Sequence, residues 1–136
     1  MDILTMINKI LLDANVIVRL FMRDHEAHYQ ISEAFFIALE AGEKKAILLD
    51  LIIAEVVYVL KSYYKQDKQS ITSRLKLLLQ YENIEVSNRA VIIEALEAYT
   101  KKNIDFADAI LCAKKNLESY EIMSFDKDIK KCIKEK

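Results

Sequence analysis

The sequence predicts an α/β fold in which short parallel strands alternate with helices. Four short runs of apolar, strand-forming residues recur along the chain, and helical spacing of apolar residues follows each of them instead of a tight turn. The chain has no proline and a single glycine, so it lacks the residues that usually mark hairpins. Strands that alternate with helical segments in this way indicate a parallel sheet with helical crossovers.

The four predicted strands are short and end in polar residues. They cover residues 9–13 (KILLD), 45–50 (KAILLD), 84–87 (IEVS) and 121–126 (EIMSFD). In an open parallel sheet, ligands bind beyond the carboxyl ends of the strands, where loops and helix starts meet. Asp13 and Asp126 both fall at such ends, so this edge of the sheet is the predicted place for a site.

The segments between the strands carry apolar residues at the spacing of a buried helix face. Three such stripes are Ile31, Phe35, Ala38 and Leu39; Ile71, Leu75, Leu78 and Leu79; and Val91, Ile92, Ala95, Leu96 and Tyr99. Ser87 and Asn88 suit the N-cap of a helix from about residue 89 to residue 102. Gly42 suits the end of the helix before the second strand. These stripes predict core positions without a chemical role.

Length and composition predict one domain with its own hydrophobic core, because 136 residues with 53% hydrophobic content need no disulfide framework. A net charge of −1 excludes a nucleic-acid binder that depends on bulk phosphate neutralisation. Charged residues interrupt the apolar start well short of the roughly 20 residues of a membrane span. Cys112 and Cys132 show no metal-ligand spacing. We therefore expect a soluble, cytoplasmic protein with reduced thiols.

Asp13 lies where the first predicted strand gives way to a helix. Its ordinary role there is an N-cap that accepts a hydrogen bond from the backbone of a helix starting near Val16. The same position suits a metal-binding carboxylate, with Asn15 orienting that carboxylate or a bound water. The residues by themselves leave both interpretations open.

Glu55 is the one charged residue in the ten-residue segment 51–60 (LIIAEVVYVL). Its neighbours at helical spacing, such as Leu51 and Val59, are apolar, so we expect Glu55 on a buried face. A buried carboxylate is costly unless it is paired with a cation or binds a metal. Arg19 is a candidate partner for an ion pair, and metal binding is the favoured interpretation.

Asp105 and Asp108 open the helical segment DFADAILCAKK. Asp105 is well explained as the N-cap. Asp108 falls in the first turn, where the helix dipole stabilises a carboxylate and the side chain is directed toward the crevice. Compensation of the dipole is the competing role for Asp108.

Asp126 follows the fourth predicted strand and precedes the last helix. An N-cap is again the alternative to metal binding. Ser124 is placed to donate a hydrogen bond to a metal-bound carboxylate or to a phosphate. Neither residue decides between the two roles when it is considered separately.

Taken together, Asp13, Glu55, Asp108 and Asp126 are expected to face one crevice. Clustered carboxylates repel one another, and each is pushed toward its protonated form unless a cation neutralises the group. Mg²⁺ and Mn²⁺ prefer oxygen ligands and keep water positions open for substrate phosphates. The acidic set therefore predicts a metal-dependent phosphodiesterase.

Four motifs in this order resemble the PIN-domain nucleases, in particular the VapC-type toxins of toxin–antitoxin pairs. The motifs are ILLDANVIVRLFMRD, AEVVYVL, DFADAILCA and SFDKDIKK, within residues 9–131. The resemblance implies a three-layer α/β/α sandwich around a mainly parallel sheet of four strands, or five, with about seven helices. It also implies an endoribonuclease that hydrolyses RNA phosphodiester bonds with Mg²⁺ or Mn²⁺, forms a homodimer and is inhibited by a cognate antitoxin.

The resemblance assigns the catalytic and metal-binding roles to four acids, and it places three further residues in support of them. The acids are Asp13, Glu55, Asp108 and Asp126, and the supporting residues are Asn15, Asp105 and Ser124. It places the PIN domain at residues 9–136. Residues 1–8 are then an extension or a mis-assigned start, with Met6 as an alternative start.

Three other functions fit parts of the sequence. The acidic crevice would also suit a catalytically quiet module that receives an Arg or Lys of a partner. A PIN nuclease could also act in RNA processing outside a toxin system. A phosphoaspartyl fold, either a phosphatase or a receiver, would use Asp13. A phosphatase needs a second Asp where Asn15 stands, a receiver needs an acid pair at the first strand and a Lys after the last, and neither gives Glu55 a role.

Overall fold

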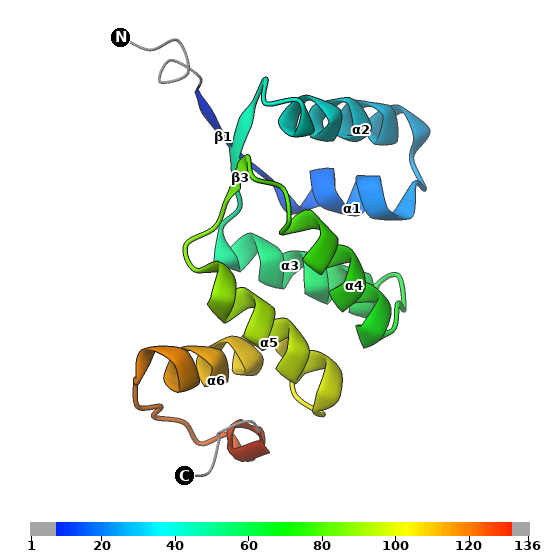
Figure 1. The fold of residues 1–136 in the computed structure, drawn as a ribbon. Helices are drawn as coiled ribbons and strands as arrows, with labels where there is room; N and C mark the ends of the chain where they lie inside the picture. The colour runs from blue at the N-terminus through cyan, green and yellow to red at the C-terminus, as the bar shows by residue number, and fades with distance from the viewer. Residues whose placement is uncertain (1–7, 132–136) are drawn as a thin grey trace, which may run out of the picture.

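The structure is a computed structural model that describes residues 8–131, and it folds them into a three-stranded parallel sheet and six α-helices (Figure 1). In chain order the elements are β1 (Lys9–Leu11), α1 (Ala14–Met22), α2 (Glu26–Glu40), β2 (Lys45–Ile47), α3 (Asp50–Ser62), α4 (Lys68–Leu78), β3 (Ile84–Glu85), α5 (Arg89–Lys101), α6 (Phe106–Glu118) and the 3₁₀ helix η2 (Lys127–Lys131). Most of the predicted extension, including Met6, lies outside the described residues.

The first three predicted strands form one sheet in the order β1-β2-β3, and both pairs are parallel. Lys9 lies opposite Lys45, and Ala46 lies opposite Ile84. The pairing continues past β1, where the Leu12 amide donates to the Ile47 carbonyl at 3.0 Å. Helices separate successive strands, so the predicted α/β class and parallel sheet are confirmed.

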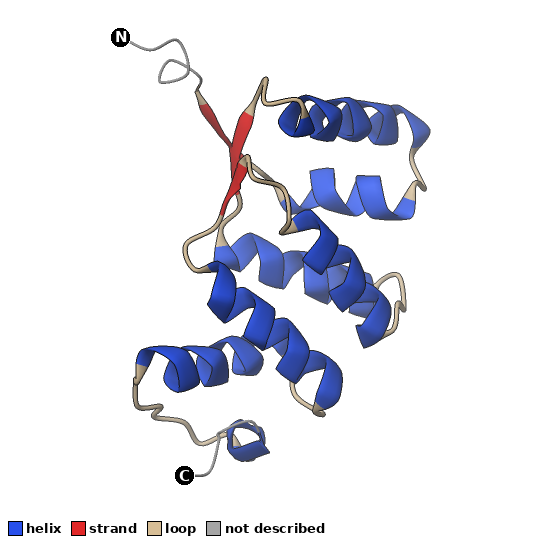
Figure 2. Cartoon of the chain, viewed as in Figure 1, coloured by secondary structure: helices blue, strands red, loops and turns tan. Residues whose placement is uncertain are grey.

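The prediction of a fourth strand at residues 121–126 is wrong for the described part of the chain, where this segment is a loop between α6 and η2 (Figure 2). The sheet therefore has three strands instead of four or five, and six α-helices with one 3₁₀ helix replace the expected seven or so. A strand forms only where a neighbouring strand offers backbone partners. Residues 121–126 lie at the opposite end of the molecule from β1 (Figure 1).

The predicted helix ends are confirmed where local chemistry sets them. Asn88 is the N-cap of α5, and its side chain accepts a hydrogen bond from the Val91 amide at 3.2 Å. Gly42 follows the end of α2 with φ of 79°, a left-handed conformation that glycine adopts without strain. Leu39, Leu75 and most other members of the apolar stripes are buried in a single core, but the prediction of Ile31 as a core residue is wrong, because its side chain is 69% exposed. None of the helices between residues 8 and 131 is long and apolar enough to cross a membrane.

The last three helical elements form a carboxy-terminal unit, residues 89–131, which comprises α5, α6 and η2. The Phe106 ring packs edge-on against Tyr99, with ring centroids 5.8 Å apart. Lys102 Nζ donates to the Lys131 carbonyl at 2.8 Å, and Lys131 Nζ donates to the Asn103 carbonyl at 3.2 Å. These contacts hold α6 against α5, and they hold the end of η2 against the residues that connect α5 to α6.

Cys112 is buried in α6 and is disulfide-bonded. The expectation of a reduced thiol is therefore wrong for Cys112, and Cys132 lies outside the described residues. Sequence spacing does not show which Cα atoms lie within the roughly 4.4–6.8 Å that a disulfide requires.

Candidate metal centre

Asp13 is the N-cap of α1, directly beyond the carboxyl end of β1. Its backbone is extended, with φ of −93° and ψ of 154°, and Oδ1 accepts a hydrogen bond from the Ala14 amide at 2.8 Å. The predicted cap is confirmed, although the helix begins at Ala14 instead of near Val16. The Asp13 side chain is exposed, as is that of Asn15 two residues later, so the cap orients a carboxylate that external ligands can reach.

Glu55 is exposed on α3, and the prediction of a buried carboxylate is wrong. The buried face of α3 is formed by Ile53, Val56, Val57 and Leu60. Leu51 and Tyr58, four residues before and three after Glu55, are 66% and 68% exposed. Two of the apolar neighbours of Glu55 therefore lie on the surface, while Ile52 and Val59 are partly buried. Apolar character in the sequence did not indicate burial of Glu55 itself.

Arg19 is not positioned as the partner of Glu55, because it interacts with another carboxylate. Its Nη1 donates to Asp24 Oδ1 at 3.0 Å, and the Tyr64 hydroxyl donates to Asp24 Oδ2 at 2.6 Å. This cluster connects the end of α1 to the end of α3. The ion pair between Glu55 and Arg19 is therefore not formed. Glu55 remains a candidate metal ligand.

Asp108 and Asp126 are brought together in the carboxy-terminal unit. Asp108 is half-buried in the first turn of α6. Burial raises the pKa of the Asp108 carboxyl, and the hydrogen bond with Asp126 and the negative charges of Asp126, Asp105 and Asp128 raise it further. Because these carboxylates repel one another, a cation between Asp108 and Asp126 would relieve the repulsion.

Local hydrogen bonds hold Asp126 in place. Its amide donates to Ser124 Oγ at 3.0 Å, and its Oδ1 accepts from the Asp128 amide at 2.9 Å at the start of η2. The predicted cap at Asp126 is confirmed, and Ser124 supports its backbone. Asp105 stands at the N-cap position of α6 without a side-chain capping bond, so its carboxylate is not engaged by the helix.

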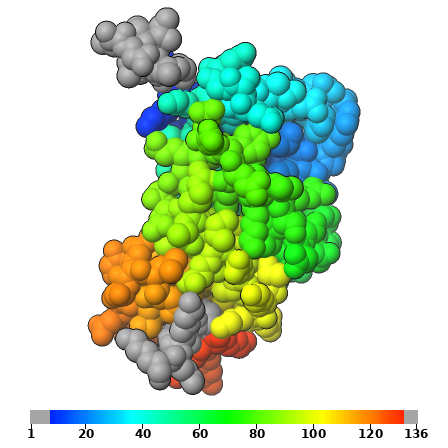
Figure 3. Space-filling view, in the orientation of Figure 1, coloured from blue at the N-terminus to red at the C-terminus, as the bar shows by residue number. Residues whose placement is uncertain are grey.

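The four predicted acids do not converge in one crevice of the single chain. Asp13 and Glu55 belong to a sheet half, residues 9–64, whereas Asp108 and Asp126 belong to the carboxy-terminal unit. Figure 3 shows the amino-terminal blue and cyan segments and the carboxy-terminal orange and red segments at opposite ends of the molecule, whereas α3, which carries Glu55, contacts α6. Within residues 8–131, no three acidic, histidine or cysteine side chains are grouped closely enough to hold a metal. Asp108 and Asp126 fit part of a metal centre and require further oxygen ligands.

A groove of about 330 Å³ separates α3 from the start of α6, and sequence reasoning missed most of the residues that line it. They include Tyr58, Lys61, Tyr99 and Asp105. Beside it, Lys68 lies over the Tyr99 ring, 4.3 Å from Nζ to the ring centroid, and burial lowers its pKa. The sequence gives little indication of this groove. Tyr58 and Lys61 follow Glu55 at helical spacing, and nothing else in the sequence distinguishes them.

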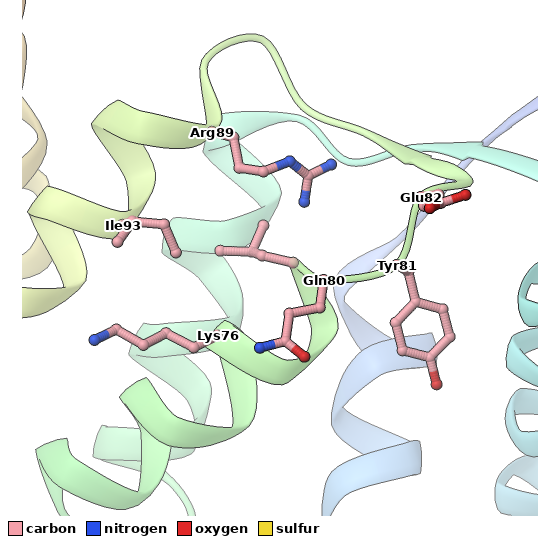
Figure 4. A pocket seen from close by; sticks show the side chains of 7 residues that line it. Lys76, Gln80, Tyr81, Glu82, Arg89 and Ile93 are labelled. Carbon is pink, nitrogen blue, oxygen red and sulfur yellow. The ribbon is translucent and has the colours of Figure 1, made fainter.

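A larger hollow of about 470 Å³ lies between the end of α4, the following loop and the start of α5 (Figure 4). Arg89 extends into it from α5 and donates to the Ile84 carbonyl at 2.7 Å, while Lys76 lines it from α4. None of the four predicted acids lines this hollow. Although this hollow is larger than the groove beside α3, it is therefore not the candidate metal centre.

Comparison with known proteins identifies the family. The PIN domain model matches residues 10–134. The chain is 30% identical over 122 residues to the VapC ribonuclease of Aquifex aeolicus (strain VF5), an alignment that covers 89% of this chain and 90% of that protein. No solved structure matches the chain. The chain belongs to the PIN-domain family, within the group of VapC ribonucleases.

Proposed function

We propose that this protein is an endoribonuclease that hydrolyses RNA phosphodiester bonds with Mg²⁺ or Mn²⁺ and that it is the toxin of a toxin–antitoxin pair. The observation that supports this most directly is the contact between Asp108 and Asp126, in which the pKa of Asp108 is raised by burial and by like charge. The similarity to a VapC ribonuclease supplies the substrate class.

Asp13, Glu55, Asp108 and Asp126 are the proposed metal ligands, with Asn15, Asp105 and Ser124 in support. Hard divalent cations suit a set made of carboxylate oxygens. When bound, such a cation lowers the pKa of an attacking water and neutralises charge on the leaving oxygen. No covalent intermediate on the protein is required.

The chain's own residues would orient the reacting groups. The Ala14 amide holds one oxygen of Asp13, and the Asp128 amide holds one oxygen of Asp126, so neither carboxylate rotates freely. Tyr58 and Lys61, which line the groove beside Asp105, would contact the RNA through ring stacking and phosphate pairing.

A cleavage assay on purified protein tests this function. With Mg²⁺ or Mn²⁺ we expect cleavage of RNA, and EDTA should abolish it. Asp13→Asn and Asp126→Asn should each lower the rate by at least about 10–100-fold, the cost of disturbing even residues that only support a ligand. Glu43→Gln, an exposed change in the loop before β2, is the matched control and should leave the rate unchanged. Cleavage that needs no metal, or full activity of both acid variants, would refute the proposal.

A catalytically quiet partner-binding module is the second candidate. The exposed apolar side chains of Leu11, Leu51 and Tyr58 near Asp13 and Glu55 favour protein contact at this surface. A basic segment of an antitoxin would place Arg or Lys against the acids. Growth arrest on expression, relieved by changing the four acids to amides, favours the toxin, whereas stable partner binding with no RNA cleavage by the freed chain favours the module.

A further inference from the structure

The first relevant feature is the groove between α3 and the start of α6. Its volume of about 330 Å³ is at the small end of the roughly 300–1,000 Å³ of ligand pockets. Tyr58, which lines the groove from α3, comes three residues after Glu55. Asp105, which lines it at the start of α6, comes three residues before Asp108. The groove therefore lies about one helical turn from two proposed metal ligands.

The second feature is the hydroxyl group of Tyr99. This residue lines the groove, and its side chain is only 3% exposed. Within residues 8–131, the Tyr99 hydroxyl has no hydrogen-bond partner. Burial raises its pKa, and the negative charge of Asp105 raises it further, so the hydroxyl keeps its proton. A buried hydroxyl is costly unless it is hydrogen-bonded, which favours a ligand that accepts from Tyr99.

The third feature is the way Lys68 holds the chain that enters α6. Its Nζ donates to the Lys102 carbonyl at 3.2 Å and to the Ile104 carbonyl at 2.9 Å, directly before Asp105. It also lies 4.3 Å from the centroid of the Tyr99 ring. These contacts occupy Lys68 and fix one wall of the groove. Asp105 forms no capping bond and no ion pair in the part of the chain that the structure describes, so both of its oxygens can accept.

The fourth feature is the exposed side of the groove, which Tyr58 and Lys61 form. They are three residues apart on α3, so they lie on the same helix face. Tyr58 is 68% exposed, and Lys61 is exposed as well. An exposed aromatic ring offers a stacking surface to a nucleobase, and an ammonium group beside it pairs with a phosphate. The groove thus combines a ring, a carboxylate, a hydroxyl donor and a cation.

We propose that this groove binds one guanine base of the single-stranded RNA substrate, stacked on Tyr58 and hydrogen-bonded by Asp105 and Tyr99. The Watson–Crick edge of guanine presents O6, N1–H and N2–H₂ side by side. The two nitrogens would donate to the two oxygens of Asp105, and O6 would accept from the Tyr99 hydroxyl. Adenine, cytosine and uracil lack two adjacent N–H donors on this edge, so a carboxylate pairs with them less well.

This inference deepens the proposed ribonuclease function and rests on it for the choice of RNA as the ligand. It gives Asp105 a role in base recognition in addition to its support of the metal ligands. The binding of the base requires neither metal nor cleavage, so it can be measured in EDTA. The two ideas can therefore fail separately.

Fluorescence anisotropy of labelled RNA with the full chain in EDTA measures the base preference. The probes are the single-stranded RNA UUGUU and four variants with adenine, cytosine, uracil or inosine at the centre. We expect UUGUU to bind about 10-fold more tightly than the other four, the effect of one bidentate pair. Inosine is the sharpest comparison, because its base keeps O6 and N1–H and lacks only the N2 amino group.

Asp105→Asn tests the carboxylate. An amide has a single acceptor oxygen, so the variant should bind the guanine and inosine RNAs with equal affinity. Because it also loses a negative charge, it should bind UUUUU at least as tightly as wild type, which an unfolded chain would not do. Tyr99→Phe keeps the ring and removes the hydroxyl, so it should lower the preference for guanine over adenine. Glu43→Gln removes the same charge in the loop before β2 and should keep the full preference.

Tyr58→Ala tests the stacking surface. It should weaken the binding of all five RNAs by about 10-fold, because every base has a face that stacks. Tyr58→Phe keeps the ring and should bind as wild type does. Tyr63→Ala is the matched control, since Tyr63 is 75% exposed and does not line the groove, and it should leave the affinities unchanged.

The outcomes distinguish the base site from the ribonuclease function. Equal binding of all five RNAs by wild type, tighter binding of another base, or no binding at all would overturn the guanine site and leave the function standing. A guanine preference that survives Asp105→Asn would also overturn it. A wild type that prefers guanine through Asp105, but cleaves no RNA with Mg²⁺ or Mn²⁺, would overturn the function and support the base site.

Discussion

Two carboxyl groups, one in each part of the molecule, have pKa values shifted in opposite directions. In the sheet half, the hydrogen bond from the Tyr64 hydroxyl, supported by Arg19, lowers the pKa of Asp24. In the carboxy-terminal unit, burial and the neighbouring Asp126 raise the pKa of Asp108. The charge of Asp24 is balanced within its own chain, whereas that of Asp108 is opposed by its own chain.

This difference separates a structural acid from a candidate functional one. An acid held by a tyrosine and an arginine already has the partners that its ionised form needs. An acid that faces other acids gains stability only from a cation, a proton or a basic partner that comes from outside. Four measurements test this contrast between Asp24 and Asp108, and each of them can either support it or contradict it.

The largest effect on stability should come from the ring contact between Tyr99 and Phe106, which holds α6 against α5. Phe106→Ala removes a buried ring that packs on Tyr99 and should cost about 3–5 kcal/mol of unfolding free energy. Hydrogen exchange should accelerate in α6 and η2 before it does in β1 and β2, because the lost contact lies in the carboxy-terminal unit. Leu48→Ala, a buried change beyond β2, is the control and should accelerate exchange throughout. Equal acceleration in both variants would show that the two parts unfold as one.

The next effect should be stabilisation by metal. At about 100 times its dissociation constant, Mg²⁺ or Mn²⁺ should raise the unfolding free energy by about 2.7 kcal/mol. Asp126→Asn should abolish most of this gain, because it removes a proposed ligand. Thermal denaturation with and without EDTA measures it, with Glu43→Gln as the control. The same metal-dependent shift in wild type and Asp126→Asn would contradict a role for the pair.

A smaller effect should appear in the pH dependence of the metal-free protein. Because the folded pKa of Asp108 is raised above its ordinary value near 3.8, its contribution to stability is present below that value and is lost as the pH rises through the folded pKa. Asp126→Asn removes a like charge, so it should lower the pKa of Asp108 and reduce this loss. NMR titration of the Asp108 carboxyl, with denaturation over the same pH range, checks both. An unchanged pKa of Asp108 in the variant would show that Asp126 does not act on it.

The smallest effect should come from Tyr64→Phe in the sheet half. The folded pKa of Asp24 is lowered, so its contribution is present above the ordinary value and is lost as the pH falls through the folded pKa. The melting temperature of the variant should therefore be slightly below that of wild type at neutral pH. In acid the two melting temperatures should be equal. Tyr63→Phe, at a neighbouring exposed tyrosine, is the matched control. A melting difference that persists in acid would assign the effect to packing instead of to the Asp24 charge.

The sequence by itself determined the features that depend on neighbouring residues. Caps at Asp13 and Asn88, the glycine after α2, three strands and the buried stripes were predicted from short segments, because hydrogen bonds and helical periodicity act within a few residues. The identity of the four acids as candidates also came from their local motifs.

The tertiary structure alone decided which predicted groups meet. Glu55 is exposed although its sequence neighbours are apolar, and residues 121–126 form no strand although their composition favours one. Burial depends on which helix face packs against the core, and a strand exists only with a partner edge that lies far away in the sequence. Asp108 therefore contacts Asp126, while Asp13 and Glu55 stay in the other part of the molecule, because packing on α5 decides where the last three elements lie.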